Sequence, residues 1–180
     1  MGLDGLMRLW SGSGLRHIPA HSSRSVLDET YAGVARLNRW NEAGTPTFYF
    51  ACDIGVVIAE YARHIAGELP EGEAERQVRD VWKVAITIER MIDLTDPATS
   101  AALSLPPIGE WIGDVARTQA TSRFLRQHAD VQGLRVPSVA FPDKHGKWNA
   151  VIYLDRVDAR TAFGEPRFVR QFALEAVGHS

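Results

Sequence analysis

The residue best placed for chemistry is Glu60, an acidic side chain at the edge of an amphipathic helix. The apolar residues of this segment recur at helical spacing and form one stripe: Ile54, Val57, Ile58, Tyr61 and Ile65. At about 100° per residue, Glu60 lies roughly 110° from the middle of the stripe, where core meets solvent. A carboxylate there can be half desolvated and still reach a ligand. Because most helical glutamates are solvated, an ordinary boundary residue is the alternative interpretation.

The elements that must position Glu60 follow one another as loop, strand, cap and helix within residues 39–64. A turn is indicated by three residues that favour turns: Asn41, Gly44 and Pro46. Residues 47–51 are β-branched or aromatic for the most part, which favours a short buried strand. Asp53 can accept hydrogen bonds from the free amides of a following turn. It is therefore the expected N-cap of a helix that begins at Ile54.

The rest of the chain mixes helices with short strands. Strands are predicted at residues 6–10, 81–89, 134–139, 149–154 and 167–174. Residues 81–89 alternate apolar and polar side chains most cleanly, as a half-buried strand does. Because the elements show no regular strand–helix–strand period, an α+β fold is expected rather than a doubly wound α/β fold.

Helix and loop signals complete the secondary-structure prediction. Asp96-Pro97 can cap and begin a helix, and Pro106-Pro107 ends that segment. Residues 111–128 are predicted to be mostly helical, with this apolar stripe: Ile112, Val115, Ala116, Ala120, Phe124 and Leu125. Three other segments are predicted as follows: residues 11–24 a loop, 25–38 a short helix or ordered loop, and 71–80 a solvated turn or short helix.

Composition narrows the class of protein. The chain has 180 residues, of which 45% are hydrophobic and 23% charged, so one soluble globular domain is expected. The formal net charge is −2 and no dense Lys/Arg cluster occurs, which disfavours direct nucleic-acid binding. No apolar run approaches the ~18 residues of a membrane span, and the N-terminus lacks a signal-peptide layout. A single cysteine, Cys52, fits a reducing compartment, so a cytoplasmic location is expected.

Several familiar sites are disfavoured by their missing motifs. The chain has no Gly-x-Gly-x-x-Gly after a strand, no P-loop, no Gly-x-Ser-x-Gly and no His-Glu-x-x-His. His17 and His21 flank Pro19, which argues against a helix that presents both to a metal, and no third ligand is near. Cys52 has no histidine at a useful spacing and is expected to be a small buried filler. No metal site is therefore predicted.

Two blocks of the sequence carry a resemblance to a known family. The first holds, in order, Arg39-Trp40-Asn41, Gly44, Tyr49, Ala51 and Ala59-Glu60. The second is Gly133-Leu134-Arg135-Val136-Pro137-Ser138, followed by Asn149-Ala150-Val151-Ile152-Tyr153. In this order the blocks resemble the motifs of the RES domain, a family named for Arg, Glu and Ser. The resemblance extends from about Leu6 to Val157.

This resemblance implies a fold and a function. RES-domain proteins are similar to the ADP-ribosyltransferase-like fold, a mixed β-sheet core with flanking helices. Here that implies one domain over residues 1–180, with a core at about 6–157 and a C-terminal strand and tail at 158–180. The implied function is a toxin that consumes NAD as its substrate and is paired with an Xre-type helix-turn-helix antitoxin. The ADP-ribose would pass to water or to inorganic phosphate, and a homo-oligomer is compatible with the family.

The matched residues suit cleavage of the nicotinamide–ribose bond, which builds positive charge on the ribose. Glu60 would stabilise the ribosyl cation and accept a hydrogen bond from a ribose hydroxyl. Arg39 would grip phosphate oxygens through two donors. Tyr49 would stack on the nicotinamide or donate its hydroxyl. Ser138 would bond the ribose or the nicotinamide amide, and Asn149 would be a further polar anchor.

Each of these residues also has an ordinary structural interpretation. Tyr49 can be a sheet aromatic, Ser138 can close a turn after Pro137, Asn149 can cap a strand, and Arg39 can be a surface residue.

Two other functions remain open at this level. One is an ADP-ribosyltransferase that modifies a protein, although such enzymes of this fold often carry a Gln/Glu-x-Glu pair, and Ile58 stands two residues before Glu60. The other is a non-enzymatic interaction domain whose partner matters more than its pocket. Labelled NAD added to a lysate distinguishes the first, because a protein would become labelled. Absence of NAD binding together with a tight protein complex would indicate the second.

Overall fold

Six strands form one mixed β-sheet in the structure, a computed structural model that describes residues 2–30, 32–33, 38–69 and 74–177. The strands are β1 (Met7–Pro19), β2 (Thr47–Ala51), β3 (Ala74–Asp93), β4 (Gly133–Pro137), β5 (Trp148–Tyr153) and β6 (Arg167–Val177). Their order in the sheet is β1-β2-β5-β4-β3-β6. Only β3 and β4 pair in parallel, whereas the other neighbours are antiparallel. The expected α+β class with a mixed sheet is therefore confirmed.

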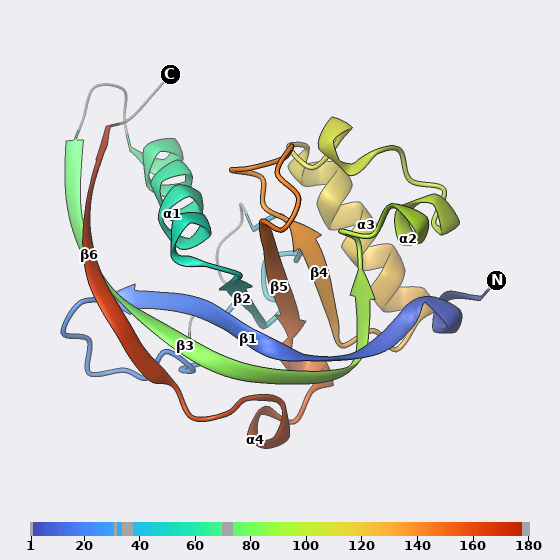
Figure 1. The fold of residues 1–180 in the computed structure, drawn as a ribbon, viewed down its shortest axis with the longest axis horizontal. Helices are drawn as coiled ribbons and strands as arrows, with labels where there is room; N and C mark the ends of the chain where they lie inside the picture. Colours follow the sequence, from blue (N-terminus) through green and yellow to red (C-terminus); the bar gives the residue numbers. More distant parts are fainter. Residues whose placement is uncertain (1, 31, 34–37, 70–73, 178–180) are drawn as a thin grey trace.

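The sheet closes on itself because β1 pairs with two strands. Besides its short contact with β2 at Leu15 and Ala51, β1 pairs with β3 from Met7–Ile92 to Pro19–Arg79. The five strands β1, β2, β5, β4 and β3 thus form a strongly curved ring of neighbours. β6 pairs antiparallel with the other edge of β3, and in Figure 1 these two long strands curve past the first helix.

The described residues also form four α-helices. They are α1 (Ile54–Glu68), α2 (Pro97–Ala102), α3 (Val115–His128) and α4 (Ala159–Ala162), with short 3-10 turns η1 (Leu3–Leu6), η2 (Ile108–Glu110) and η3 (Leu154–Arg156). In Figure 1, α1 lies against the antiparallel pair of β3 and β6, whereas α2 and α3 lie beside β4 at the opposite end. Both predicted caps are confirmed, since Asp53 Oδ1 accepts from the Val56 amide at 3.0 Å and Asp96 Oδ1 from the Ala98 amide at 3.1 Å.

Two strands are longer than the sequence pattern predicts. The predicted loop at residues 11–24 is wrong for residues 11–19, which continue β1, and the predicted turn or helix at 71–80 is wrong for 74–80, which begin β3. Residues 71–73 lie outside the described residues. Both errors have one cause. Ser, Gly and charged residues show no apolar period, so the sequence pattern does not identify these segments as strands. They are extended here only because a partner strand supplies backbone hydrogen bonds.

Gly14 shows why the first strand is rich in glycine. A Cβ at this position would lie 2.5 Å from Cβ of Phe50 on β2, so only glycine lets the two strands approach. The described part of residues 25–38 forms turns without a helix, in agreement with the ordered-loop alternative. In the described chain, no helix is both long and apolar enough to cross a membrane.

Two glycines with positive φ lie before and after Arg39 in the chain. Gly33 has φ +77° and Gly44 has φ +89°, and the Gly44 amide donates to the Gly33 carbonyl at 3.0 Å. A Cβ on Gly33 would lie 1.8 Å from the carbonyl oxygen of Thr45, whereas one on Gly44 would meet nothing within 4 Å. Substitutions at these two positions therefore distinguish two costs. An added Cβ causes backbone strain alone at Gly44, and strain together with a steric clash at Gly33.

We expect Gly44→Ala to lower the free energy of unfolding by roughly 1–2 kcal/mol, the cost of a left-handed residue with a Cβ. Gly33→Ala should lower it by several kcal/mol more, since a backbone oxygen must also move. Urea unfolding followed by circular dichroism measures both. Equal losses for the two variants would show that the contact between Gly33 and Thr45 does not constrain this loop.

Candidate functional site

Glu60 lies at the point where α1 meets the ends of two central strands. One of its oxygens, Oε1, accepts a hydrogen bond from Ser138 Oγ at 2.6 Å and another from Asn149 Nδ2 at 3.2 Å. The other oxygen, Oε2, receives no hydrogen bond from the described residues. Glu60 itself is half-buried. The carboxylate is thus fixed through one oxygen and keeps the second available for a ligand.

Ser138 and Asn149 reach Glu60 because β4 and β5 pair in register. Asn149 is opposite Val136 on β4 and Ala51 on β2, and Ser138 follows directly after β4. Ser138 is 0% exposed, its amide donates to the Lys147 carbonyl at 2.9 Å, and its Oγ accepts from the Ala140 amide at 3.2 Å. The serine hydroxyl is therefore held by the turn while it donates to Glu60.

Arg39 lies within electrostatic range of Glu60 and is anchored to the segment before α3. Its Nη1 donates to the carbonyl of Gly113 at 2.8 Å and to that of Ile112 at 3.4 Å. Burial and then the positive charge of Arg63 lower the pKa of Arg39, whereas Glu60 and Tyr49 act in the opposite direction. Two guanidinium groups and one carboxylate therefore share this part of the molecule.

Arg63 is a residue that the sequence reasoning missed. It stands three positions after Glu60 on α1, so the two side chains are neighbours on the helix surface. Arg63 is exposed and makes no hydrogen bond or ion pair with any other described residue. Its position at i+3 from the glutamate is the signal that would have identified it.

Tyr49 contributes its hydroxyl to the loop of Arg39. The hydroxyl donates to Asn41 Oδ1 at 2.6 Å and accepts from the Trp40 amide at 3.1 Å. Burial raises the pKa of Tyr49 above its ordinary value, so the side chain remains a neutral phenol. Asn41, which the sequence reasoning treated only as part of a turn, is thus the partner that orients Tyr49.

The other side of the Arg39 loop is held by polar residues of α3. Ser122 Oγ donates to the Trp40 carbonyl at 2.7 Å, and Gln119 Nε2 donates to the carbonyls of Asn38 at 2.8 Å and Asn41 at 3.3 Å. These bonds fix the backbone on both sides of Arg39. The structure thereby gives α3 a positioning role for the candidate site.

The apolar stripe predicted for residues 111–128 is confirmed at Ile112 and Leu125, which are buried, and is wrong for most of its other residues. The buried residues of α3 are Thr118, Ser122 and Leu125, whereas Ala116 and Ala120 are exposed and Phe124 is 47% exposed. The buried face is polar because the Arg39 loop offers carbonyl groups that need hydrogen-bond donors.

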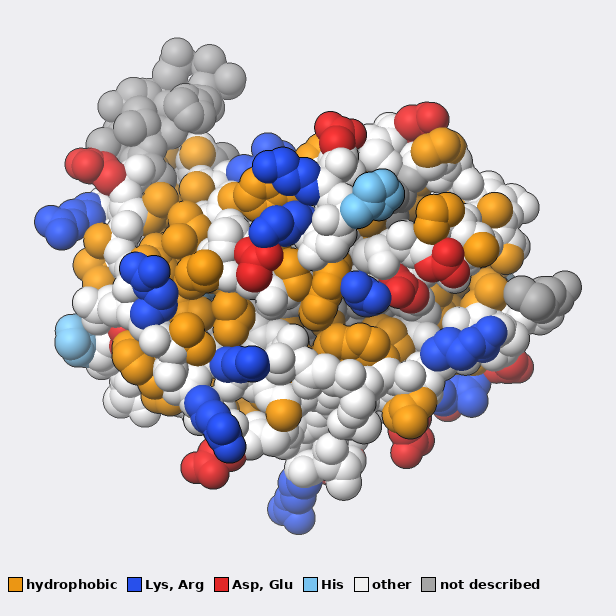
Figure 2. Space-filling model, in the orientation of Figure 1, with side chains coloured by type: hydrophobic (Ala, Val, Ile, Leu, Met, Phe, Trp, Pro, Cys, Tyr) orange, Lys and Arg blue, Asp and Glu red, His pale blue; other side chains and the backbone are white. Residues whose placement is uncertain are grey.

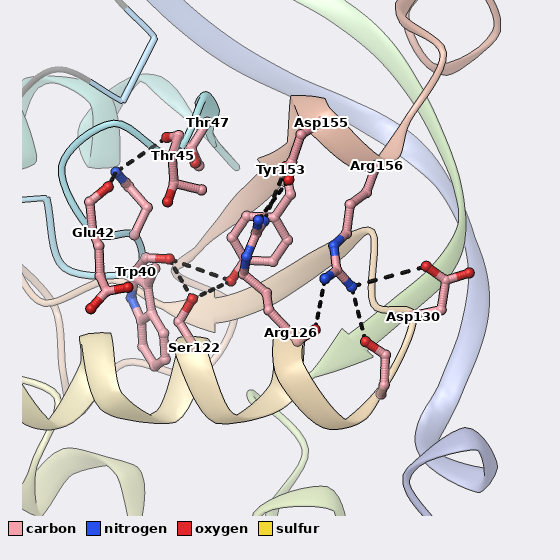
Figure 3. Close-up of polar contacts among 12 residues, drawn as sticks. Trp40, Glu42, Thr45, Thr47, Ser122, Arg126, Asp130, Tyr153, Asp155 and Arg156 are labelled. Atoms are coloured by element: carbon pink, nitrogen blue, oxygen red, sulfur yellow. Dashed lines mark hydrogen bonds and ion pairs between the residues drawn. The ribbon is translucent and has the colours of Figure 1, made fainter.

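Figure 3 shows how this network continues into β5. Ser122 Oγ and the Tyr153 hydroxyl are 2.6 Å apart, and both reach the Trp40 carbonyl. Arg126 covers the Tyr153 ring, with 4.4 Å from its Cζ to the ring centroid, and binds both carboxylate oxygens of Asp155 at 3.1 and 2.7 Å. Burial raises the pKa of Tyr153, which keeps its hydroxyl protonated in this network.

The candidate metal pair His17 and His21 does not assemble into a metal site. No group of three metal-ligating side chains occurs among the residues that the structure describes. The His17 ring packs on Tyr61 at a centroid distance of 4.5 Å, and its Nδ1 accepts from Arg79 Nε at 3.1 Å. Burial, reinforced by the charge of Arg79, lowers the pKa of His17 to about 3. His17 is thus a neutral packing residue beneath α1.

Cys52 precedes the cap of α1 and is partly exposed. Its sulfur accepts from the Trp148 amide at 3.3 Å, and burial is the first cause that raises the pKa of its thiol. A raised pKa disfavours the reactive thiolate. These contacts agree with a structural filler rather than a nucleophile, but the predicted burial is wrong, since Cys52 is only half-buried.

Comparisons with known proteins identify a family and a fold. The family model of the RES domain matches residues 14–174. Among solved structures, the chain is similar to one from the M. tuberculosis MbcT–MbcA toxin–antitoxin complex, with a TM-score of 0.64 and 21% sequence identity. The match covers 96% of this chain and 89% of that chain. No curated protein matches the sequence. The resemblance and the fold inferred from the sequence motifs are thereby confirmed.

The stability of the protein towards acid should depend on the half-buried His17. Because the pKa of His17 is lower in the folded protein than its ordinary 6.5, the unfolded chain binds the proton more readily. Stability is therefore lost as the pH falls below about 6.5 towards about 3. At 1.36 kcal/mol per pKa unit, this group should remove roughly 3 kcal/mol of unfolding free energy between pH 7 and pH 4.

We expect His17→Gln to remove this part of the pH dependence, since the glutamine oxygen can still accept from Arg79 but does not titrate. The measurement is the free energy of unfolding in urea from pH 7 to pH 4. The exposed His145→Gln should keep the parental slope. A parental slope in His17→Gln as well would show that His17 titrates normally.

Proposed function

The chain belongs to the RES domain family, and from this we propose that it is the toxin of a toxin–antitoxin pair and degrades NAD. It would break the bond between the nicotinamide nitrogen and C1′ of the ribose. The bonding electron pair leaves with nicotinamide, which becomes neutral, and C1′ takes an oxygen from water or from inorganic phosphate. When water is the acceptor, it releases one proton.

The observation that carries this proposal is the hydrogen bonding of the Glu60 carboxylate, which accepts bonds at only one of its two oxygens. As the glycosidic bond breaks, positive charge develops on the ribose, and a fixed anion beside it lowers the barrier. Ser138 and Asn149 both donate to Oε1, so Oε2 can face the ribose without any rearrangement of the carboxylate. The site is therefore preorganised for a cationic transition state.

The arginines supply the second requirement, which is a grip on the pyrophosphate. Arg39 is held by the carbonyls of Ile112 and Gly113, and Arg63 makes no ion pair within the described chain. Two cations beside one carboxylate leave one positive charge uncompensated, so a further anion would be favourable between them. A diphosphate, which presents several oxygens to guanidinium groups, satisfies this condition.

The roles of the remaining residues follow from their contacts. Ser138 orients Glu60 and would move its hydroxyl between the carboxylate and a ribose hydroxyl. Asn149 holds the Glu60 carboxylate in place through the bond that its side-chain amide donates. The Tyr49 hydroxyl is occupied by Asn41 and Trp40, so we assign it to positioning of the Arg39 loop and its ring face to the nicotinamide.

Nicotinamide release from NAD by the purified protein tests the reaction. We expect Glu60→Gln to lower turnover by about 10²–10³-fold, the usual loss when a single electrostatic contact to a transition state is removed. The fold should persist, because the glutamine oxygen can accept the same bonds from Ser138 and Asn149. The exposed Glu110→Gln is the matched control and should turn over as the parent does.

Parental turnover in Glu60→Gln would disprove the assignment of Glu60. If no NAD is consumed by parental protein that is free of any co-purified partner, the enzymatic proposal itself is wrong. Assays with and without inorganic phosphate identify the acceptor, since phosphorolysis needs phosphate and gives a phosphorylated ADP-ribose.

The antitoxin proposal has its own test, co-expression with a helix-turn-helix protein encoded beside this chain. We expect the two proteins to co-purify and NAD turnover to fall in the complex, since an antitoxin must block its toxin. Separate elution of the two proteins on size-exclusion chromatography, with full toxicity in cells that express both, would contradict the proposed pairing.

A further inference from the structure

A cavity of about 590 Å³ lies beside the candidate catalytic site without including it. It is enclosed by α2 with the proline segment that follows and by the loop between β4 and β5. Pro137 and Lys147 line it, but Glu60 and Arg39 do not. Its size falls within the range of small-molecule sites, about 300–1,000 Å³. None of the residues assigned above to the reaction at Glu60 lines this cavity.

The walls of the cavity are unusually rich in proline. The chain has nine prolines, and five line this space: Pro97, Pro106, Pro107, Pro137 and Pro142. Proline rings are rigid and lack a backbone donor, so these walls are flat, apolar and formed before any ligand binds. The Trp111 indole donates to the Pro106 carbonyl at 3.1 Å and fixes that wall. Such a surface suits a planar ring.

The rim on the loop side is basic. Lysine is rare in this protein, which has only Lys83, Lys144 and Lys147, and the last two line the cavity. Lys147 is paired with Asp53 at 2.6 Å, so its charge is largely compensated. Lys144 is exposed and lies over the Phe141 ring at 5.2 Å, without a carboxylate partner in the described chain. In Figure 2, Lys and Arg side chains gather over this loop, near the centre of the face.

Two further side chains of the rim contribute to the electrostatic environment of a bound ligand. His145 stands beside Lys144 and lines the cavity, whereas Asp143 places one carboxylate on the same rim. An anionic group is therefore attracted by the Lys144 ammonium, where the His145 ring can add a hydrogen-bond donor, and repelled at the side of Asp143. The cavity combines a flat apolar interior with one free ammonium group at its edge.

We propose that this cavity binds an aromatic phosphate ester of the nucleoside monophosphate class. The base packs between the proline walls, and the phosphate meets Lys144 and His145 at the rim. The proposal concerns binding alone and does not depend on NAD cleavage. Two sources share this chemistry: a separate mononucleotide, and the adenylate half of a dinucleotide whose other half reaches Glu60.

Calorimetric titration of the purified protein with AMP tests the proposal, with adenosine as the probe that lacks the phosphate. We expect saturable AMP binding and at least tenfold weaker adenosine binding. Lys144→Gln should weaken AMP binding about tenfold, whereas Lys83→Gln on β3 should leave it unchanged. Asp143→Asn should tighten it severalfold, because a repelling carboxylate is removed.

A second variant tests the apolar interior without touching the charges. Ala101 on α2 lines the cavity and is exposed, so Ala101→Leu places extra volume inside it and suits a helix. We expect this variant to lose both AMP and adenosine binding while its unfolding midpoint stays near that of the parent. No saturable AMP binding in the parent, or parental affinity in both Lys144→Gln and Ala101→Leu, would overturn the proposal.

A competition experiment distinguishes a separate mononucleotide from the adenylate half of a dinucleotide. If the cavity holds the adenylate half of the dinucleotide, AMP should displace ADP-ribose from Glu60→Gln protein. If it holds a separate mononucleotide, the two ligands should bind together. Because calorimetry needs no turnover, failure of AMP to bind is distinguishable from an inactive Glu60 site.

Discussion

The structure depends on the compensation of a half-buried carboxylate. Removal of a charge from water is unfavourable unless hydrogen bonds replace the solvent, and Glu60 receives these bonds from Ser138 and Asn149. The two donors come from the ends of β4 and β5, while the acceptor comes from α1. The bonds therefore join the helix to the strands at one point. Both bonds end on Oε1 of Glu60, so Oε2 remains available to a ligand.

The arginine loop is fixed by the same need to satisfy buried polar groups. Residues 38–45 have little regular structure, so their carbonyls and side chains require partners outside the loop. Gln119 and Ser122 of α3 satisfy the carbonyls on one side, and Tyr49 satisfies Asn41 and Trp40 on the other. Arg39 projects from a backbone held on both sides, which keeps its guanidinium near Glu60.

The loop between β4 and β5 belongs to both the candidate functional site and the proline-lined cavity. At its first residue, Ser138 donates to Glu60, and its residues 142–147 line the cavity. Lys147 links the two, since its carbonyl accepts from the Ser138 amide and its ammonium pairs with Asp53, the cap of α1. Burial alone would raise the pKa of Asp53, but the bonds from Lys147 and the Val56 amide bring it below the ordinary value. The N-terminus of the helix that carries Glu60 is thus held by this loop through the pair of Lys147 and Asp53.

The sequence by itself determined the elements whose signals are local. The Asp53 cap, the stripe of α1 and the alternation within residues 81–89 need no distant partner, so propensity and periodicity identified them. The ordered motifs likewise identified Arg39, Glu60 and Ser138 as residues that match the pattern of one family, before their geometry was known. Only the tertiary structure decided that residues 11–19 are extended, because β3 supplies their hydrogen bonds. It also decided that α3 buries Thr118 and Ser122, since a polar helix face is favourable inside a protein only when a distant loop presents the groups that it can bind.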